Sequence, residues 1–277
     1  MQEKPISKLF QNGILKTNVE YKSPRYLSIM NRIRLIISFI LISLWSAHSF
    51  ALASTVKNKP LNIAVASNFK LSAQHIAHEF TEISGIKVNI SSASTATLYQ
   101  QILRGAPFDV FLSADQKHID LLIDANKVNQ EHEFIYAQGR LVFWKPDITR
   151  VPTLQDFLLY DGRLAIANPK FAPYGIAAEE TLKSIKKWQV QQYIKGNNIN
   201  QAYQFVESKN VRAGLVAYAS VIQKQQKNYV IIPQEWHHPI KQAGIVLNND
   251  ETKHAQLFRQ FLLSENMQKY IKSQGYN

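Results

Sequence analysis

The sequence predicts an α/β protein of two lobes with a ligand cleft between them. Three observations lead to this prediction. The 277 residues are about two domains' worth of chain. Apolar strand patterns alternate with helix patterns, and helices between successive strands favour mostly parallel sheets. Roughly nine or ten strand patterns occur in about 220 residues, which is generous for one doubly wound sheet and favours two lobes.

The strand and helix patterns follow one another along the chain. Short apolar runs predict strands at residues 61–66, 86–90, 109–112, 134–144 (one long strand or a pair), 164–167, 213–216, 229–232 and 243–247. Apolar residues at 3.6-residue spacing predict helices at 68–83, 95–104, 115–123, 174–188, 199–208 and 252–273. In the first helix Phe69, Ile76 and Phe80 share one face. Gly105 ends the second helix and Asp115 caps the third.

These patterns divide the chain into three parts. Residues 1–53 precede the globular part, residues 54–137 with 235–277 are expected to form the first lobe, and residues 138–234 the second. The two strands that cross between the lobes are expected to act as a hinge that closes on a ligand.

A short apolar segment predicts a secretory signal peptide. Residues 35–45 form a charge-free run of 11 residues, whereas a helix needs about 20 to span a bilayer core. Arg32 and Arg34 precede the run, and the small residues Ala51 and Ala53 follow it. A basic start, a short apolar centre and a small-residue exit are typical of a cleaved leader. We expect cleavage after Ala53.

An unusual extension lies upstream of this leader. Met30 begins a conventional signal peptide of about residues 30–53, so residues 1–29 are either an over-read upstream of the true start or an extended basic segment. Without residues 1–53 the formal charge falls from +12 to +7. The remaining charge is scattered, and no zinc-finger, helix-turn-helix or aromatic–basic RNA pattern accompanies it. We therefore expect no nucleic-acid partner.

The chain contains no cysteine. This excludes disulfide scaffolds, thiolate metal sites, Fe–S clusters and cysteine nucleophiles. It also excludes attachment through a lipidated cysteine, so we expect a free periplasmic protein. A monomer without a cofactor is the expected state.

Four strand-to-helix junctions carry small hydroxyl or amide side chains, at residues 66–68, 91–95, 168–175 and 196–200. In open α/β sheets ligands bind at the carboxyl ends of strands. Helix N-termini there offer unpaired N–H groups and the positive end of the helix dipole. A fully ionised oxyanion only accepts hydrogen bonds, so converging junctions of neutral donors would suit it. Ordinary N-capping is the alternative interpretation of each junction.

Six segments resemble the periplasmic molybdate-binding proteins of ABC uptake systems: residues 63–69, 94–99, 105–115, 139–142, 167–175 and 198–206. The block Gly-Ala-Pro-Phe-Asp-Val-Phe-Leu-Ser-Ala-Asp at 105–115 is quite specific, and the likeness covers essentially all of residues 60–275. The resemblance implies a type II periplasmic binding fold, each lobe a mostly parallel sheet flanked by helices. It also implies capture of molybdate or tungstate and delivery to an ABC permease.

The resemblance also implies a set of anion ligands: Ser67, Asn68, Ser94, Thr95, Tyr174, Ile199 and Tyr218. The first four would contribute side chains at the first two junctions, and the next two would contribute main-chain N–H groups. Tyr218 follows Ala217, the position at which some relatives carry a ligand tyrosine. Molybdenum would be bound only as its oxyanion, through these same residues. The sequence does not separate molybdate from tungstate.

Other chemistry remains open at this point. His75 and His78 with Glu79 form half of a metal motif, and His237 with His238 is a second weak candidate. The first group is expected to lie on the solvated surface and the second in a loop, so neither is expected to bind a metal. The alternatives are therefore a binding protein for sulfate, Fe(III) or Zn(II), or an enzyme on the same fold. No motif joins a nucleophile to a base, so a binding protein is the prediction.

Overall fold

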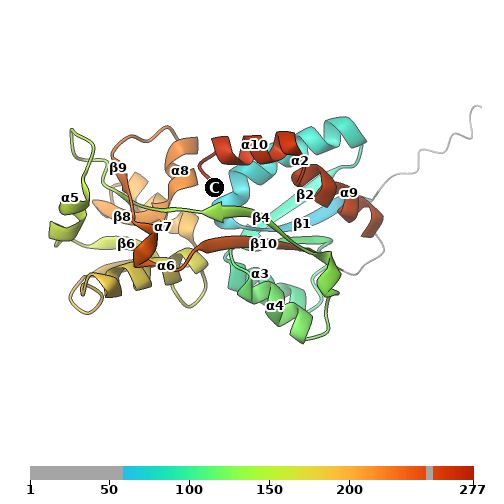
Figure 1. Ribbon diagram of the computed structural model, residues 1–277, viewed down its shortest axis with the longest axis horizontal. Coiled ribbons are helices and arrows are strands. Elements are labelled where there is room, and N and C mark those ends of the chain that lie inside the picture. Colours follow the sequence, from blue (N-terminus) through green and yellow to red (C-terminus); the bar gives the residue numbers. More distant parts are fainter. Residues whose placement is uncertain (1–58, 248–251) are drawn as a thin grey trace, which may run out of the picture. The chain divides into compact units, whose positions relative to one another are not determined.

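The computed structural model describes residues 59–247 and 252–277. The expected extension and signal peptide, residues 1–53, lie outside these ranges. The strands form two five-stranded sheets, ordered β2-β1-β3-β10-β4 and β7-β6-β8-β5-β9 (Figure 1). The first sheet contains β1 (Leu61–Ala66), β2 (Val88–Ala93), β3 (Val110–Leu112), β4 (Glu133–Gly139) and β10 (Ile240–Val246). The second contains β5 (Leu141–Trp144), β6 (Leu164–Ala167), β7 (Tyr193–Gly196), β8 (Ala213–Ala217) and β9 (Tyr229–Ile231).

Both sheets combine parallel and antiparallel pairs. In the first sheet β1 pairs in parallel with β2 and β3, while β10 is antiparallel to β3 and β4. In the second, β6 is parallel to β7 and β8, while β5 is antiparallel to β8 and β9. The predicted α/β architecture with two sheets is therefore present, and the expected mostly parallel sheets are mixed. The parallel pairs join strands of the strand–helix units, which require crossover helices.

Helices cover both faces of each sheet. Their bounds are α2 (Lys70–Ser84), α3 (Thr95–Leu103), α4 (Lys117–Asp124), α5 (Leu154–Leu159), α6 (Pro173–Ser184), α7 (Ile199–Glu207), α8 (Tyr218–Gln223), α9 (Thr252–Leu262) and α10 (Glu265–Ser273). Short 3-10 turns lie at η1 (Ser67–Phe69), η2 (Gln130–His132) and η3 (Gln234–Trp236). In Figure 1, α2, α9 and α10 lie on one face of the first sheet, and α3 and α4 on the other. We call each sheet with its helices a lobe.

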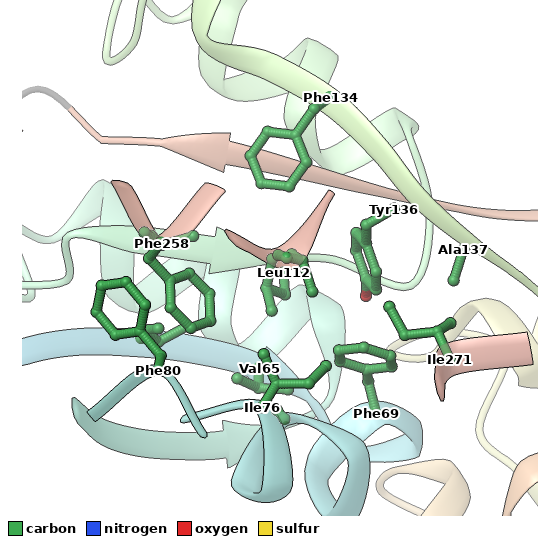
Figure 2. Close-up of a cluster of buried hydrophobic side chains, with 14 of the residues drawn as sticks. Val65, Phe69, Ile76, Phe80, Leu112, Phe134, Tyr136, Ala137, Phe258 and Ile271 are labelled. Carbon is green, nitrogen blue, oxygen red and sulfur yellow. The ribbon is translucent and has the colours of Figure 1, made fainter. Parts of the chain in front are cut away.

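An aromatic cluster fixes the turn after β1 in the first lobe (Figure 2). The Phe69 ring packs edge-on against Tyr136 with centroids 4.8 Å apart, and against Tyr276 at 5.3 Å. Phe80 and Phe258 make a similar contact at 5.3 Å. Because Phe69, Ile76 and Phe80 are buried as their shared face predicts, α2 is held firmly against the sheet. The η1 turn is thereby fixed at the carboxyl end of β1.

The chain passes between the lobes at two places. After Gly139 ends β4, Arg140 leads directly into β5 of the other sheet, and the segment after β9 returns through η3 to β10. At Gly139 the backbone lies so close to the second lobe that a Cβ would sit 2.1 Å from Tyr174 Oη. Only glycine permits this approach.

Several predicted elements differ from the structure. The expected strand 86–90 runs from Val88 to Ala93 instead, because it pairs with β1 along its whole length. The prediction of a single closing helix at 252–273 is wrong. It is broken between α9 and α10, where Ser264 caps the second helix by accepting a hydrogen bond from Met267 N. In the described part of the chain, no helix is long and apolar enough to cross a membrane.

Three short elements have no counterpart among the predicted ones. The strand β7 is half-exposed and reads Tyr-Ile-Lys-Gly, without the apolar run of a buried strand. The helices α5 and α8 have six residues each. Such segments are too short for a clear 3.6-residue period.

Candidate functional site

The candidate site lies where two neighbouring parallel strands end in each lobe. In the first sheet Ala66 at the end of β1 pairs with Ala93 at the end of β2. In the second sheet Ala167 at the end of β6 pairs with Gly196 at the end of β7. Each strand leads into a helix or turn, so two helical N-termini lie side by side at the edge of each sheet. This is the arrangement that favours anions.

These two edges face each other across the lobes. Ala96 N, in the first turn of α3, donates a hydrogen bond to Phe171 O before α6 at 3.2 Å. Gln223 Nε2 on α8 donates to Ser72 Oγ on α2 at 2.8 Å. The η1 turn also contacts α7 and α8. The structure therefore brings the four predicted junctions together.

Buried apolar residues flank all four junctions and belong to one cluster. Its members include Ala66, Ala114, Ala172, Tyr174, Ile199 and Ala217. Small alanines predominate among them, which lets the backbones of the two lobes approach closely. The cluster surrounds the junctions with apolar surface, in which hydrogen bonds from neutral donors are stronger than in water.

Ser67 and Asn68 form the first junction. Ser67 is half-buried and Asn68 is 4% exposed. The Asn68 side chain donates through Nδ2 to Gln242 Oε1 at 2.9 Å, and the main-chain oxygen of Asn68 accepts from the Tyr276 hydroxyl at 2.8 Å. Asn68 Oδ1 is buried and has no hydrogen-bond partner among the described residues. This turn is fixed in place, yet one of its buried polar atoms remains unsatisfied.

Ser94 and Thr95 differ in what their hydroxyl groups do. Ser94 is the N-cap of α3: its Oγ accepts from Thr97 N at 3.3 Å and lies 2.7 Å from Thr97 Oγ1. Its hydroxyl is therefore engaged within its own helix. Thr95 is buried, and its Oγ1 accepts from Ala114 N at 3.1 Å. Since that bond uses only a lone pair, the Thr95 proton stays available to donate.

Tyr174 and Ile199 occupy the first turns of α6 and α7. Both are buried, and N–H groups of a first turn have no acceptor within their own helix. Pro173 precedes Tyr174, and Asn198 caps α7 by accepting from Gln201 N at 3.0 Å. Burial raises the pKa of the Tyr174 phenol well above its usual value, so the side chain is neutral. Both residues can thus offer a main-chain donor in a neutral setting.

Tyr218 lies at the start of α8, beside the crossing between β4 and β5. Its ring makes an edge contact with Tyr229 at 5.5 Å, and the Arg140 guanidinium lies 5.0 Å from its centroid. Its main-chain N donates to Arg140 O at 2.9 Å. Its role as an anion ligand stays a prediction.

A pocket of about 190 Å³ opens beside the first junction. Its lining includes Ser67, Asn68, Lys70, Asn200, Glu207 and Lys224. Residues of both lobes contribute, and two of the three charged residues in this set are lysines. The net positive charge of this lining favours the approach of an anion. The inner ligand candidates, by contrast, are all uncharged.

Three residues around Asn68 were not predicted from the sequence. Gln242 and Tyr276 form hydrogen bonds with Asn68, and Tyr136 forms one with Gln242. Gln242 is fully buried in β10, next to the exposed Lys241. Nothing in the sequence separates the buried polar residue of this pair from the exposed one. The two tyrosines gave no signal either, because aromatic residues are ordinary members of a core.

The histidine motifs do not form a metal centre. His75 and His78 are exposed, as expected, and the His75 ring packs on Tyr270 at 4.2 Å. His238 Nδ1 lies 2.9 Å from Glu180 Oε1, and the buried His237 directs Nδ1 to a backbone oxygen. Within residues 59–247 and 252–277, no three His, Asp or Glu side chains gather where they could hold a metal ion.

The fold and the paired helix N-termini define a two-lobed solute-binding protein. The chain belongs to the family described as bacterial extracellular solute-binding protein, whose model matches residues 61–277. This membership confirms the prediction of a binding protein rather than an enzyme.

Several similar proteins are named for molybdate. The chain is 36% identical over 217 residues to the molybdate-binding protein ModA of Rhodobacter capsulatus, covering 77% of this chain and 86% of the relative. It is 32% identical over 233 residues to ModA of Azotobacter vinelandii, covering 81% and 92%. The solved periplasmic molybdate-binding protein of Azotobacter vinelandii matches with a TM-score of 0.75 at 29% identity, over 78% of this chain and 98% of that one. This likeness confirms the predicted two-lobed type II fold.

Proposed function

We propose that this protein captures molybdate or tungstate in the cleft between its lobes and delivers the anion to an ABC permease. The observation that carries the proposal is the convergence of four junctions whose candidate ligands are all uncharged, in a chain 36% identical to a protein named for molybdate binding. The ligands are Ser67, Asn68, Thr95 and the main-chain N–H groups of Tyr174 and Ile199. Ser94 and Tyr218 complete the candidate set.

A donor-only site accounts for the choice of anion. Molybdate and tungstate are fully ionised and accept hydrogen bonds at every oxygen. Phosphate near neutral pH keeps a proton that needs an acceptor, so a site without a carboxylate disfavours it. Sulfate seeks donors as molybdate does, and cavity size must exclude it.

The proposed donors suffice for tight binding. A hydrogen bond to a charged group contributes about 1.5–3 kcal/mol net. Six or seven such bonds total about 9–21 kcal/mol, against roughly 8 kcal/mol for micromolar affinity, and the upper part of this range exceeds that value after the ordering cost. Sub-micromolar affinity is therefore the expected range.

The proposal includes a cycle of opening and closing. Residues 54–137 with 235–277 form one lobe, residues 138–234 the other, and the crossings at Gly139–Arg140 and before β10 form the hinge. The protein works as a monomer in the periplasm after cleavage of a signal peptide at about residues 30–53. The closed form presents the anion to the permease.

Thermal unfolding with a panel of ions tests this function. Molybdate and tungstate are expected to raise the melting temperature, because a ligand that binds only the folded state stabilises it as its concentration exceeds Kd. Sulfate, phosphate, Fe(III) and Zn(II) at equal concentration are the comparison. A rise with iron or zinc and none with molybdate or tungstate contradicts the proposal.

A further inference from the structure

Gln242 is a fully buried amide close to the crossing between the lobes. It lies in β10 where the pairing with β4 shifts register between Gln242 and Ala243. A buried carboxamide is costly unless its donors and acceptor are satisfied. Its partners should therefore explain why a glutamine is buried at this position of β10.

The Gln242 side chain connects Asn68, a proposed anion-binding residue, to groups of both lobes. Its Oε1 accepts from Asn68 Nδ2 at 2.9 Å and lies 3.0 Å from the Tyr136 hydroxyl, both in the first lobe. Its Nε2 donates to Tyr174 Oη in the second lobe at 3.4 Å. Gly139 leaves room for this contact, because a Cβ there would lie 3.0 Å from Gln242 Nε2.

The polarity of this arrangement does not suit an oxyanion. Asn68 presents its amine to Gln242, while its Oδ1 is buried and unpartnered among the described residues. An oxyanion accepts hydrogen bonds, so it needs the Nδ2 group of Asn68 as a donor. If both amides rotate by half a turn, Gln242 Nε2 donates to Asn68 Oδ1, and Tyr174 donates its hydroxyl proton to Gln242 Oε1. The Asn68 Nδ2 group then occupies the position in which Oδ1 had no partner.

The surroundings allow this reversal without a new unsatisfied group. The Tyr136 hydroxyl also lies 2.9 Å from Ser113 O. It can donate there while accepting from Gln242. Burial raises the pKa of Tyr136, Tyr174 and Tyr276 above the usual value, with Asp115 a lesser influence on Tyr136. The three phenols around the amides are therefore neutral over the physiological range.

We propose that Gln242 is a positioning residue that sets the orientation of the Asn68 amide: with the anion bound, Gln242 Nε2 donates to Asn68 Oδ1, so that Asn68 Nδ2 faces the anion. The inference rests on the proposed oxyanion function. It accounts for the presence of glutamine at this position. A carboxamide can both donate and accept in either orientation, whereas an ionised carboxylate can only accept.

The variant Gln242→Glu tests this role through a pH profile of molybdate affinity measured by calorimetry. At low pH the neutral acid can donate to Asn68 Oδ1 as the amide does. As the pH rises through the pKa of the introduced carboxyl, it loses that proton, fixes the Asn68 amine toward itself and repels the anion. We expect affinity to fall by about tenfold or more from about pH 5.5 to about pH 8. The unmodified protein should vary by less than about threefold.

A pair of apolar variants separates positioning from simple contact between the lobes. Gln242→Leu removes the bonds to Asn68 and Tyr174, whereas Gln223→Leu removes a different bond between the lobes, the one to Ser72. If Gln242 orients Asn68, the first variant should lose about tenfold or more in affinity and the second less than about threefold. Anion-free thermal unfolding confirms that both variants fold.

The outcomes distinguish this inference from the proposed function. Absence of molybdate binding by the unmodified protein overturns the function itself. If the unmodified protein binds, a flat pH profile for Gln242→Glu overturns the positioning role. Equal losses in the two leucine variants overturn it as well. Should Gln242→Leu fail to fold, the Gln242→Glu profile alone decides.

Discussion

Replacing Thr95 by valine is expected to lower molybdate affinity by about tenfold or more, the loss of one hydrogen bond to a charged group. Thr95 is buried at the start of α3, and its Oγ1 already accepts from Ala114 N, so its proton is the part left for a ligand. Valine keeps the shape and removes the hydroxyl. Ser67→Ala should act in the same direction at the first junction. Titration calorimetry with molybdate measures both losses.

Thr81→Val is the matched control for the Thr95 variant. Thr81 is a half-buried threonine near the C-terminal end of α2, and its hydroxyl donates to the backbone oxygens of Ala77 and Ile86. Its replacement should reduce stability slightly and leave molybdate affinity unchanged. If Thr95→Val and Ser67→Ala both bind like the unmodified protein, the anion site lies elsewhere.

Placing a methyl group at Gly139 is expected to weaken molybdate binding by about 10- to 100-fold. In Gly139→Ala the new Cβ would lie 2.1 Å from Tyr174 Oη and 2.8 Å from the ring carbon that bears it. Tyr174 must then move away from the crossing strand, which opposes the closed arrangement of the lobes. Overpacking costs about 1–3 kcal/mol, and each 1.4 kcal/mol is about tenfold in affinity. Calorimetry with molybdate measures the loss.

Ile135→Ala provides the control on the same strand. Ile135 also belongs to β4, but its side chain is 49% exposed and lies away from the crossing. Its affinity for molybdate should match that of the unmodified protein. Unchanged affinity in Gly139→Ala would show that the contact between Gly139 and Tyr174 does not govern closure.

The sequence predicted the parts of the fold whose patterns are long and buried. Strand β6 is apolar throughout, β1 is apolar except for Asn62, and the Phe69–Phe80 face of α2 repeats at helical spacing. The division of 134–144 into two strands of different sheets was left open, because nothing in the apolar pattern marks the change of sheet. The glycine at 139 does, but only the approach of Tyr174 shows why.

The candidate site was only partly accessible from the sequence. Hydroxyl and amide residues at four junctions were visible, yet the sequence treated Ser94 and Thr95 alike. The structure separates them, since Ser94 caps its own helix and Thr95 does not. Gln242 was missed because its function depends on Asn68, 174 residues away in the chain. Contacts over such separations follow from the meeting of the strands, which no local pattern encodes.

Anomalous diffraction from crystals of the protein grown with molybdate tests the central claim most directly. Data collected at the molybdenum absorption edge locate the metal independently of the protein atoms. We expect one strong peak between the lobes, within hydrogen-bond reach of Ser67, Asn68 and Thr95 and of the main-chain N–H groups of Tyr174 and Ile199. A peak at the exposed histidines would contradict the proposed site. Crystals without ordered molybdenum would also contradict it if the protein binds molybdate in solution at another site.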